Sequence, residues 1–253
     1  MKLMSLDLST KGCAIAVLDS DVSKSNSYLK DQFKLNTSFM KPSFKTTPQE
    51  IGQLLNEIQE FVETNMEFYQ PDAFIIEEIF ANNNNLDAVK PLIKIQAVVE
   101  QTISRYKLKR QSSPLVEYKC ASSIRAKFGF NIDRILSESQ FEKKQIEISK
   151  KPVKIKKDGM PAKRHPLEGM SYQQYVSDPG NYRNKYPEID FTKYRTIKPS
   201  ITEYDFAKKI LVINFVNKTF GFDFTYHDND KADAVLNVYY LYLILKEDNS
   251  DLF

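Results

Sequence analysis

The chain has 253 residues, of which 42% are hydrophobic, so it can bury one sizeable core as a single large domain or as a domain with an insertion. Its formal net charge of +3 is too small to indicate a polyanion partner, so the distribution of charge is more informative than the total. The two cysteines lack the spacing of metal or redox motifs, and the N-terminus has no signal-peptide pattern. The longest apolar run, 234–245, is shorter than the roughly 20 residues that span a bilayer. We therefore expect a cytoplasmic protein with no membrane segment.

The first expected element is a hairpin. Leu3–Leu8 and Cys13–Leu18 are short apolar runs separated by four residues that end in a glycine, which predicts two antiparallel strands. A polar stretch follows, and Phe39–Phe44 is the candidate for a third strand. Thr47, with Glu50 three residues later and proline between them, has the pattern of a capping box that starts a helix.

Helices and strands then alternate. Apolar residues at spacings of three and four predict a helix from residue 51 to about 66, and a short continuous apolar run predicts a buried strand. The expected elements after the first helix are a strand at Ala73–Ile76, a helix at 86–106, a strand at Leu115–Tyr118 and a short helix at Ala121–Phe128.

The region from about 131 to 200 has a different character. Lysines, prolines and tyrosines dominate it, and apolar periodicity is lost over most of its length, so we expect an insertion or a flexible arm. Helical spacing returns at 202–218, and 228–246 predicts a last helix with an acidic first turn and an apolar body. This order of elements indicates an α/β fold, although periodicity alone does not separate one such fold from another.

Four acidic residues lie next to apolar segments, where burying a carboxylate costs free energy. Asp7 lies inside the first apolar strand, Glu77 ends the buried strand, and Asp230 and Asp233 share one face at the start of an apolar helix. Taken singly, each has an ordinary explanation as a solvated strand residue or a helix-capping acid. Together they match a carboxylate site for hard divalent cations, which take oxygen ligands.

Three segments around these acids resemble one known family. Residues 69–80, followed by the asparagine run at 82–85 and a long helix, are similar to the segment of RuvC-type Holliday junction resolvases in which a strand ends in the second catalytic glutamate. Leu6–Ser9 resembles the first-strand aspartate segment of that family, and 230–234 resembles its C-terminal aspartate pair. Residues 116–118 resemble its next strand. The chain thus resembles a divergent bacterial or phage-encoded member with an insertion.

This resemblance implies fold, chemistry and partners. It implies an RNase H-like mixed sheet, with antiparallel hairpin strands followed by parallel strands, flanked by helices, with residues 1–253 as a single nuclease domain and 131–200 as a basic arm inserted before the last two helices. It also implies a homodimer that makes paired nicks in four-way DNA with two Mg²⁺ ions, replaceable by Mn²⁺, and no organic cofactor. Asp7, Glu77, Asp230 and Asp233 would be both the catalytic residues and the metal ligands. A phage-encoded protein would act in the host cytoplasm.

Further residues are candidates for supporting roles. His227 would share the acidic face if the last helix starts early, and would then assist proton transfer; a surface histidine is the alternative. Glu78 is a candidate for an acid that supports Glu77 without binding metal itself, or for one with no role in the site. Phe80 resembles the family's aromatic residue that contacts DNA, and packing under the next helix is equally well supported. The basic cluster of the arm is a candidate for phosphate contacts or a solvated loop, and comprises Lys150, Lys151, Lys154, Lys156 and Lys157.

Tyrosines accompany this cluster. Tyr172, Tyr175, Tyr182 and Tyr186 either order the arm or stack on opened bases.

Other functions compete with this interpretation. A related nuclease acting on flapped, otherwise branched or hybrid nucleic acid has the same acids, because the surrounding surface selects the substrate. An inactive DNA-binding version of the fold would have little reason to retain all four acids. A sugar-kinase or actin-like ATPase has a similar first hairpin, but it needs a second glycine-rich phosphate hairpin, which the seven glycines do not supply.

Overall fold

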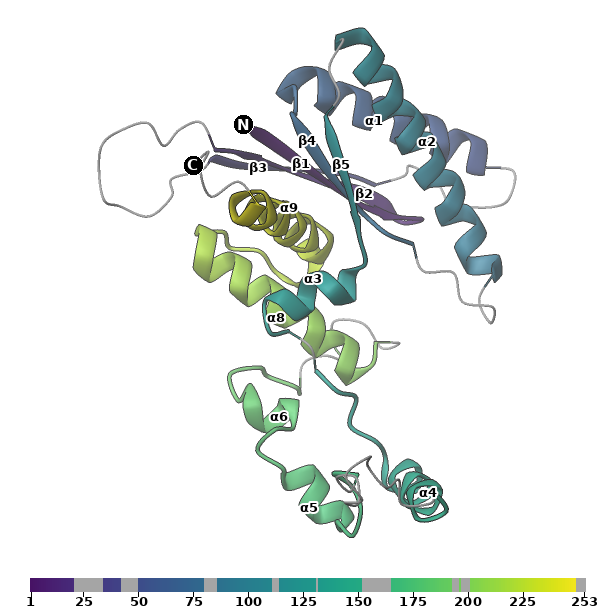
Figure 1. The fold of residues 1–253 in the computed structure, drawn as a ribbon, viewed down its shortest axis with the longest axis vertical. Coiled ribbons are helices and arrows are strands. Elements are labelled where there is room, and N and C mark those ends of the chain that lie inside the picture. The colour runs from purple at the N-terminus through teal and green to yellow at the C-terminus, as the bar shows by residue number, and fades with distance from the viewer. Residues whose placement is uncertain are drawn as a thin grey trace, which may run out of the picture. The chain divides into compact units, whose positions relative to one another are not determined.

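The computed structural model of the protein describes residues 1–20, 34–41, 50–79, 86–110, 114–130, 132–151, 165–192, 196 and 201–248. The chain forms two compact units, one made of Met1–Phe130 with Leu211–Phe253 and the other of Asn131–Ile210. Figure 1 shows the elements of both. No helix in the described ranges is long and apolar enough to cross a membrane.

The first unit contains a mixed sheet. Its strands lie in the order β3-β2-β1-β4-β5, with antiparallel pairing among the first three and parallel pairing of β1 with β4 and of β4 with β5. The sheet comprises β1 (Lys2–Ser9), β2 (Gly12–Asp19), β3 (Lys34–Met40), β4 (Ala73–Glu77) and β5 (Leu115–Lys119). The mixed RNase H-like sheet expected from the sequence is therefore confirmed.

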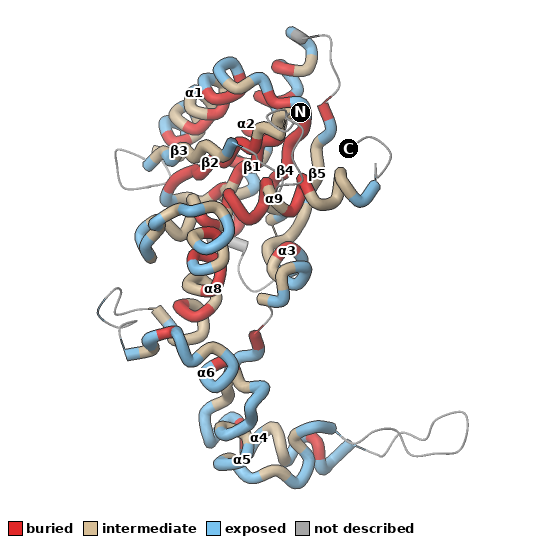
Figure 2. Tube along the Cα trace, turned by 90° about the vertical axis from the view of Figure 1, so that its left-hand side faces the viewer, coloured by how far each residue is buried: buried red, intermediate tan, exposed pale blue. Residues whose placement is uncertain are grey.

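Helices α1 (Ile51–Tyr69) and α2 (Leu86–Arg110) cover one face of this sheet (Figure 1). Their apolar faces meet alternate residues of β1, β2 and β4, because successive side chains of a strand point to opposite faces. The buried residues of this layer run in red through the sheet and the two helices (Figure 2). The fully buried members include Met4, Leu6, Ile15, Leu54, Ile58, Val62, Phe74, Ile76, Ile95 and Val99.

Helix α9 (Asn229–Asp248) packs on the other face. Small residues predominate on this side of the strands, among them Ser5, Ala14 and Ala16, and all three are fully buried. Small side chains allow the helix backbone to approach the sheet closely. The hydroxyl of Ser5 donates a hydrogen bond of 2.6 Å to the carbonyl oxygen of Ala234, which fixes α9 against β1.

Helix α3 (Ala121–Lys127) follows β5, and α8 (Glu203–Phe220) precedes α9. An aromatic cluster joins the three helices within the first unit. The ring of Phe128, directly after α3, lies 5.2 Å from the ring of Phe215 on α8 and 5.8 Å from that of Tyr239 on α9. The position of α3 against α9 is therefore set by packing.

Most expected elements are confirmed, with shifted boundaries. The third strand was predicted too late, because β3 is an edge strand with polar residues at Asn36–Ser38 and has no apolar alternation to mark it. Helix α1 runs three residues beyond the expected end and stops at Gln70, which adopts the left-handed conformation with φ of 54°. The capping box predicted at Thr47 lies outside the described residues.

The second unit has more regular structure than the sequence predicted. It contains α4 (Glu138–Ser149), α5 (Tyr172–Ser177) and α6 (Tyr182–Lys185). Helices α4 and α5 start with complete capping boxes, formed by Ser137 with Gln140 and by Ser171 with Gln174. These helices are short and weakly amphipathic, so caps mark them better than apolar periodicity does.

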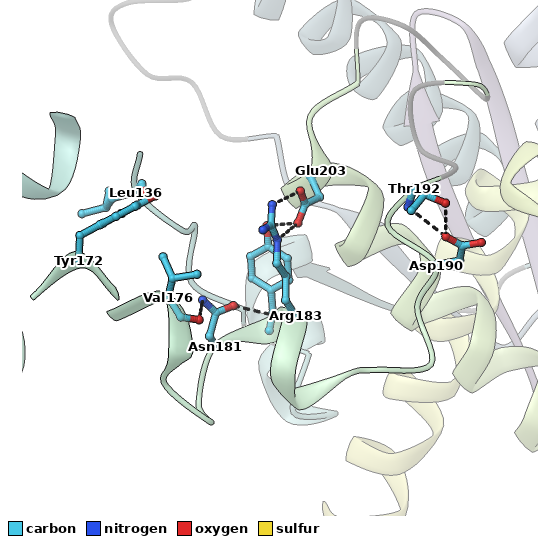
Figure 3. Close-up of polar contacts among 9 residues, drawn as sticks. Leu136, Tyr172, Val176, Asn181, Arg183, Asp190, Thr192 and Glu203 are labelled. Carbon is cyan, nitrogen blue, oxygen red and sulfur yellow. Dashed lines mark hydrogen bonds and ion pairs between the residues drawn. The ribbon is translucent and has the colours of Figure 1, made fainter. Parts of the chain in front are cut away.

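Polar and aromatic contacts hold this unit together (Figure 3). The guanidinium of Arg183 binds both carboxylate oxygens of Glu203, and the same carboxylate accepts a hydrogen bond from the buried Tyr182 hydroxyl. The ring of Tyr175 stacks on that of Phe141 at 5.0 Å, and the Tyr172 hydroxyl donates to the carbonyl oxygen of Leu136. Tyr172, Tyr175 and Tyr182 thus order the arm, the first of the two roles predicted for them.

Candidate active site

The two central parallel strands bring Asp7 and Glu77 together. Leu6 of β1 pairs with Ile76 of β4, so Asp7 and Glu77 are the next residues on adjacent strands. Ser5 contacts α9, and strand alternation places Asp7, two residues further on, on the same face. The two side chains lie close enough for each to influence the pKa of the other.

Helix α9 adds the other two acids. Asp230 and Asp233 lie in its first turns, and both interact electrostatically with Asp7 and with Glu77. The bond between Ser5 and the carbonyl of Ala234, the residue after Asp233, anchors this part of the helix to β1. The structure therefore gathers all four predicted acids from β1, β4 and α9 into one cluster.

Burial and mutual repulsion raise the pKa values of two of these acids. Burial is the largest influence on Asp7 and raises its pKa well above the ordinary range, and the charges of Glu77, Asp233 and Asp230 raise it further. Burial also raises the pKa of Glu77, with help from Asp233, whereas the charge of Arg125 opposes this rise. Asp7 and Glu77 therefore retain protons more strongly than free carboxyl groups do.

Arg125 of α3 is a member of this cluster that the sequence analysis did not single out. Its Nη2 donates to Oδ1 of Asp233 at 2.9 Å, and the two side chains are only 19% and 13% exposed. Its Nε is buried and has no hydrogen-bond partner among the described residues. The sequence showed only a basic residue in the short helix α3, which follows β5. The fold is needed to show that this residue lies beside Asp233.

The donor set of the cluster fits a hard divalent cation, because all four side chains offer carboxylate oxygens and Mg²⁺ prefers such ligands. However, no three His, Cys, Asp or Glu side chains in the described part of the chain are arranged so that they could hold a metal ion as they stand. Asp233 is paired with Arg125 through its Oδ1. The chemistry of a metal site is present, and one of its carboxylates is engaged by an internal cation.

The remaining predicted residues lie apart from the acids or outside the described ranges. Glu78 is exposed, and its backbone N–H donates to the carbonyl oxygen of Lys119 at 3.0 Å. His227 is exposed in the short 3-10 helix η2 (Tyr226–Asp228), and α9 begins after it at Asn229. Phe80 is not among the described residues.

The lysines of the arm are described only in part. Lys150 is the C-cap of α4, Lys151 follows it, and both are exposed residues of the second unit. Lys154, Lys156 and Lys157 lie outside the described residues.

Several solved structures similar to this chain are Holliday junction resolvases. RuvC of T. thermophilus in complex with a Holliday junction substrate is 14% identical, with 50% of this chain and 68% of that one covered and a TM-score of 0.37. The yeast mitochondrial resolvase Ydc2 is 9% identical, with 96% and 83% covered and a TM-score of 0.34. The fowlpox virus resolvase is 13% identical, with 98% and 99% covered and a TM-score of 0.31. No protein-family model and no curated protein matches the chain.

Proposed function

We propose that this chain is a metal-dependent endonuclease that cuts four-way DNA junctions by paired phosphodiester hydrolysis. The observation that carries the nuclease proposal is that three separate segments bring four acids together near the carboxyl ends of β1 and β4: Asp7, Glu77, Asp230 and Asp233. Buried carboxylates whose charges act on one another are unfavourable unless cations or protons neutralise them. The choice of a four-way junction rests on the resemblance of the sequence to RuvC-type resolvases.

The four acids would hold two Mg²⁺ ions, and Mn²⁺ would substitute for them. When bound, such a pair supplies an activated water and stabilises the leaving oxygen of the phosphodiester. Asp7 and Glu77, whose pKa values are raised, would release their protons as cations bind. The Ser5 bond holds α9 against β1, so that acids of both elements lie on the same side of the sheet.

Residues outside the acidic cluster would bind the DNA. Exposed Lys150 and Lys151, with Lys154, Lys156 and Lys157, would contact phosphates without reading sequence. Phe80 would contact bases at the junction. His227 lies two residues before α9 and three before Asp230, and it would assist proton transfer.

The direct test offers purified protein and Mg²⁺ a four-way junction, a flap, a plain duplex and an RNA:DNA hybrid in parallel. A junction resolvase gives symmetric paired nicks only in the first substrate. Cleavage of the flap or the hybrid instead would assign the alternative, a related nuclease with another substrate. No cleavage of any substrate would remove the nuclease proposal.

Substitutions then test the residues. Asp7→Asn, Glu77→Gln and Asp233→Asn should each abolish cleavage and leave junction binding largely intact, because a metal ligand is lost while phosphate contacts remain. The matched control is Glu67→Gln on α1, whose side chain is 69% exposed and lies on the opposite face of the sheet. Wild-type cleavage rates in any of the first three variants would refute the site.

We also propose a homodimer, because two coordinated nicks across a two-fold junction need two sites related by the same symmetry. Light scattering of the free and junction-bound protein tests this assembly. A monomer in both states would contradict it.

A further inference from the structure

Arg125 forms an ion pair inside the acidic cluster. Its guanidinium holds Oδ1 of Asp233 at 2.9 Å, both side chains are largely buried, and its charge also acts on Asp7 and Glu77. We propose that Arg125 is a positioning residue, an internal counter-cation that holds Asp233 in the metal-free protein and must release it when a divalent cation binds. This inference rests on the proposed metal-dependent function.

The metal-free cluster needs such a cation. The charge of Asp233 acts on both Asp7 and Glu77 and raises the pKa of each, so Asp233 is a further negative group in this cluster. A buried carboxylate without a partner is costly, whereas a guanidinium supplies both charge and directed N–H groups. Arg125 therefore gives the Asp233 carboxylate a positive partner before any metal arrives.

The same contact competes with metal binding. A cation at Asp233 would take up carboxylate oxygens that Arg125 now engages, and the two positive charges would repel each other at short range. The buried, unpartnered Nε shows that the guanidinium is not fully satisfied where it is.

A purely structural role gives the opposite expectation. If Arg125 only fastened α3 to α9, its loss would loosen the carboxylates, and divalent cations would bind with equal or lower affinity. If Arg125 competes with the cation, its loss removes a repelling charge and tightens binding. The sign of the change in metal affinity thus separates the two roles.

A neighbouring residue provides a matched control. Lys127 also lies on α3 and also pairs with α9, through Glu247 at 2.6 Å, but this pair is more exposed, with 41% and 61% of the side chains accessible, and none of the four acids takes part in it. Lys127→Met therefore removes one α3–α9 ion pair without touching the cluster.

The experiment measures Mn²⁺ binding to the full chain, without DNA, by isothermal titration calorimetry. We expect Arg125→Gln to lower the Kd for Mn²⁺ about tenfold, which corresponds to about 1.4 kcal/mol, and Lys127→Met to leave it unchanged. Arg125→Lys keeps a charge but loses the planar fork, so its Kd should lie between those of the wild type and Arg125→Gln. Arg125→Lys also keeps the test decisive if Arg125→Gln does not fold.

The outcomes separate this inference from the proposed function. Mn²⁺ binding to the wild type that is abolished by Asp233→Asn, but is equal or weaker in folded Arg125 variants, would overturn the role of Arg125 and leave the metal site standing. Absence of Mn²⁺ binding in the wild type and in every Arg125 variant would overturn both.

Discussion

The hydrogen bond between Ser5 and Ala234 offers a sensitive test of how the site is assembled. Replacing Ser5 with alanine removes a hydroxyl that donates to a helix carbonyl oxygen at 2.6 Å in a fully buried position. The carbonyl of Ala234 lies within α9, so it remains available to the helix ladder and no orphaned acceptor is created. The cost is therefore that of one buried hydrogen bond, about 0.5–1.5 kcal/mol.

For a chain of this length, a loss of 1 kcal/mol lowers Tm by about 2–4 °C. Thermal unfolding followed by circular dichroism measures this shift. Ser9→Ala is the control. The Ser9 hydroxyl donates to the carbonyl oxygen of Gly12 and accepts from the Lys11 backbone N–H, but both bonds are longer, at 3.1 Å, and lie in the more exposed hairpin turn, so their loss should lower Tm less. Ser5→Val, which adds volume under α9, should cost more, about 1–3 kcal/mol.

The site should respond as well. Because this bond anchors α9 next to Asp233, Ser5→Ala should also weaken Mn²⁺ binding, whereas Ser9→Ala should not. Equal stability of Ser5→Ala and the wild type, or a Ser5→Val variant as stable as the wild type, would refute the close packing of α9 on β1 as the reason that the acids meet.

Three further predictions follow from other parts of the structure. Asp7→Asn should raise the Tm of the metal-free protein at pH 7. Because the pKa of Asp7 is raised in the folded protein, the contribution of this carboxyl group to stability is complete below about pH 3.8 and is lost as the pH rises through the folded-state pKa. The gain in Tm of the variant over the wild type should therefore disappear in acid. Gly12→Ala should destabilise the protein by about 1–3 kcal/mol in urea denaturation, since the new Cβ would lie 2.5 Å from the carbonyl oxygen of Met40, and an unchanged midpoint would contradict this clash. Arg183→Met should leave the Glu203 carboxylate, only 15% exposed, without its guanidinium and cost about 1–3 kcal/mol; hydrogen exchange should accelerate within 131–210 and stay unchanged in the sheet.

The sequence identified the elements that carry strong periodicity. Continuous apolar runs marked β1, β2 and β4, helical spacing of apolar residues marked α1, α2 and α8, and an apolar body after an acidic first turn marked α9, because burial on a sheet or helix face requires apolar residues there. Elements without such burial were missed or displaced. The edge strand β3 began earlier than expected. Helices α4 to α6 went unrecognised, because their stability comes from caps, stacked rings and ion pairs such as that between Arg183 and Glu203.

For the candidate site, the sequence by itself determined which acids are out of place. Asp7 interrupts an apolar strand and Glu77 ends a buried one, so the free-energy cost of burying these carboxylates could be inferred without coordinates. Only the tertiary structure decided that they meet Asp230 and Asp233, since this requires the parallel register of β1 with β4 and the docking of α9 through Ser5. The place of Arg125 was likewise decided by the fold, because a basic residue on a short helix gains meaning only when packing sets it against a carboxylate 108 residues away along the chain.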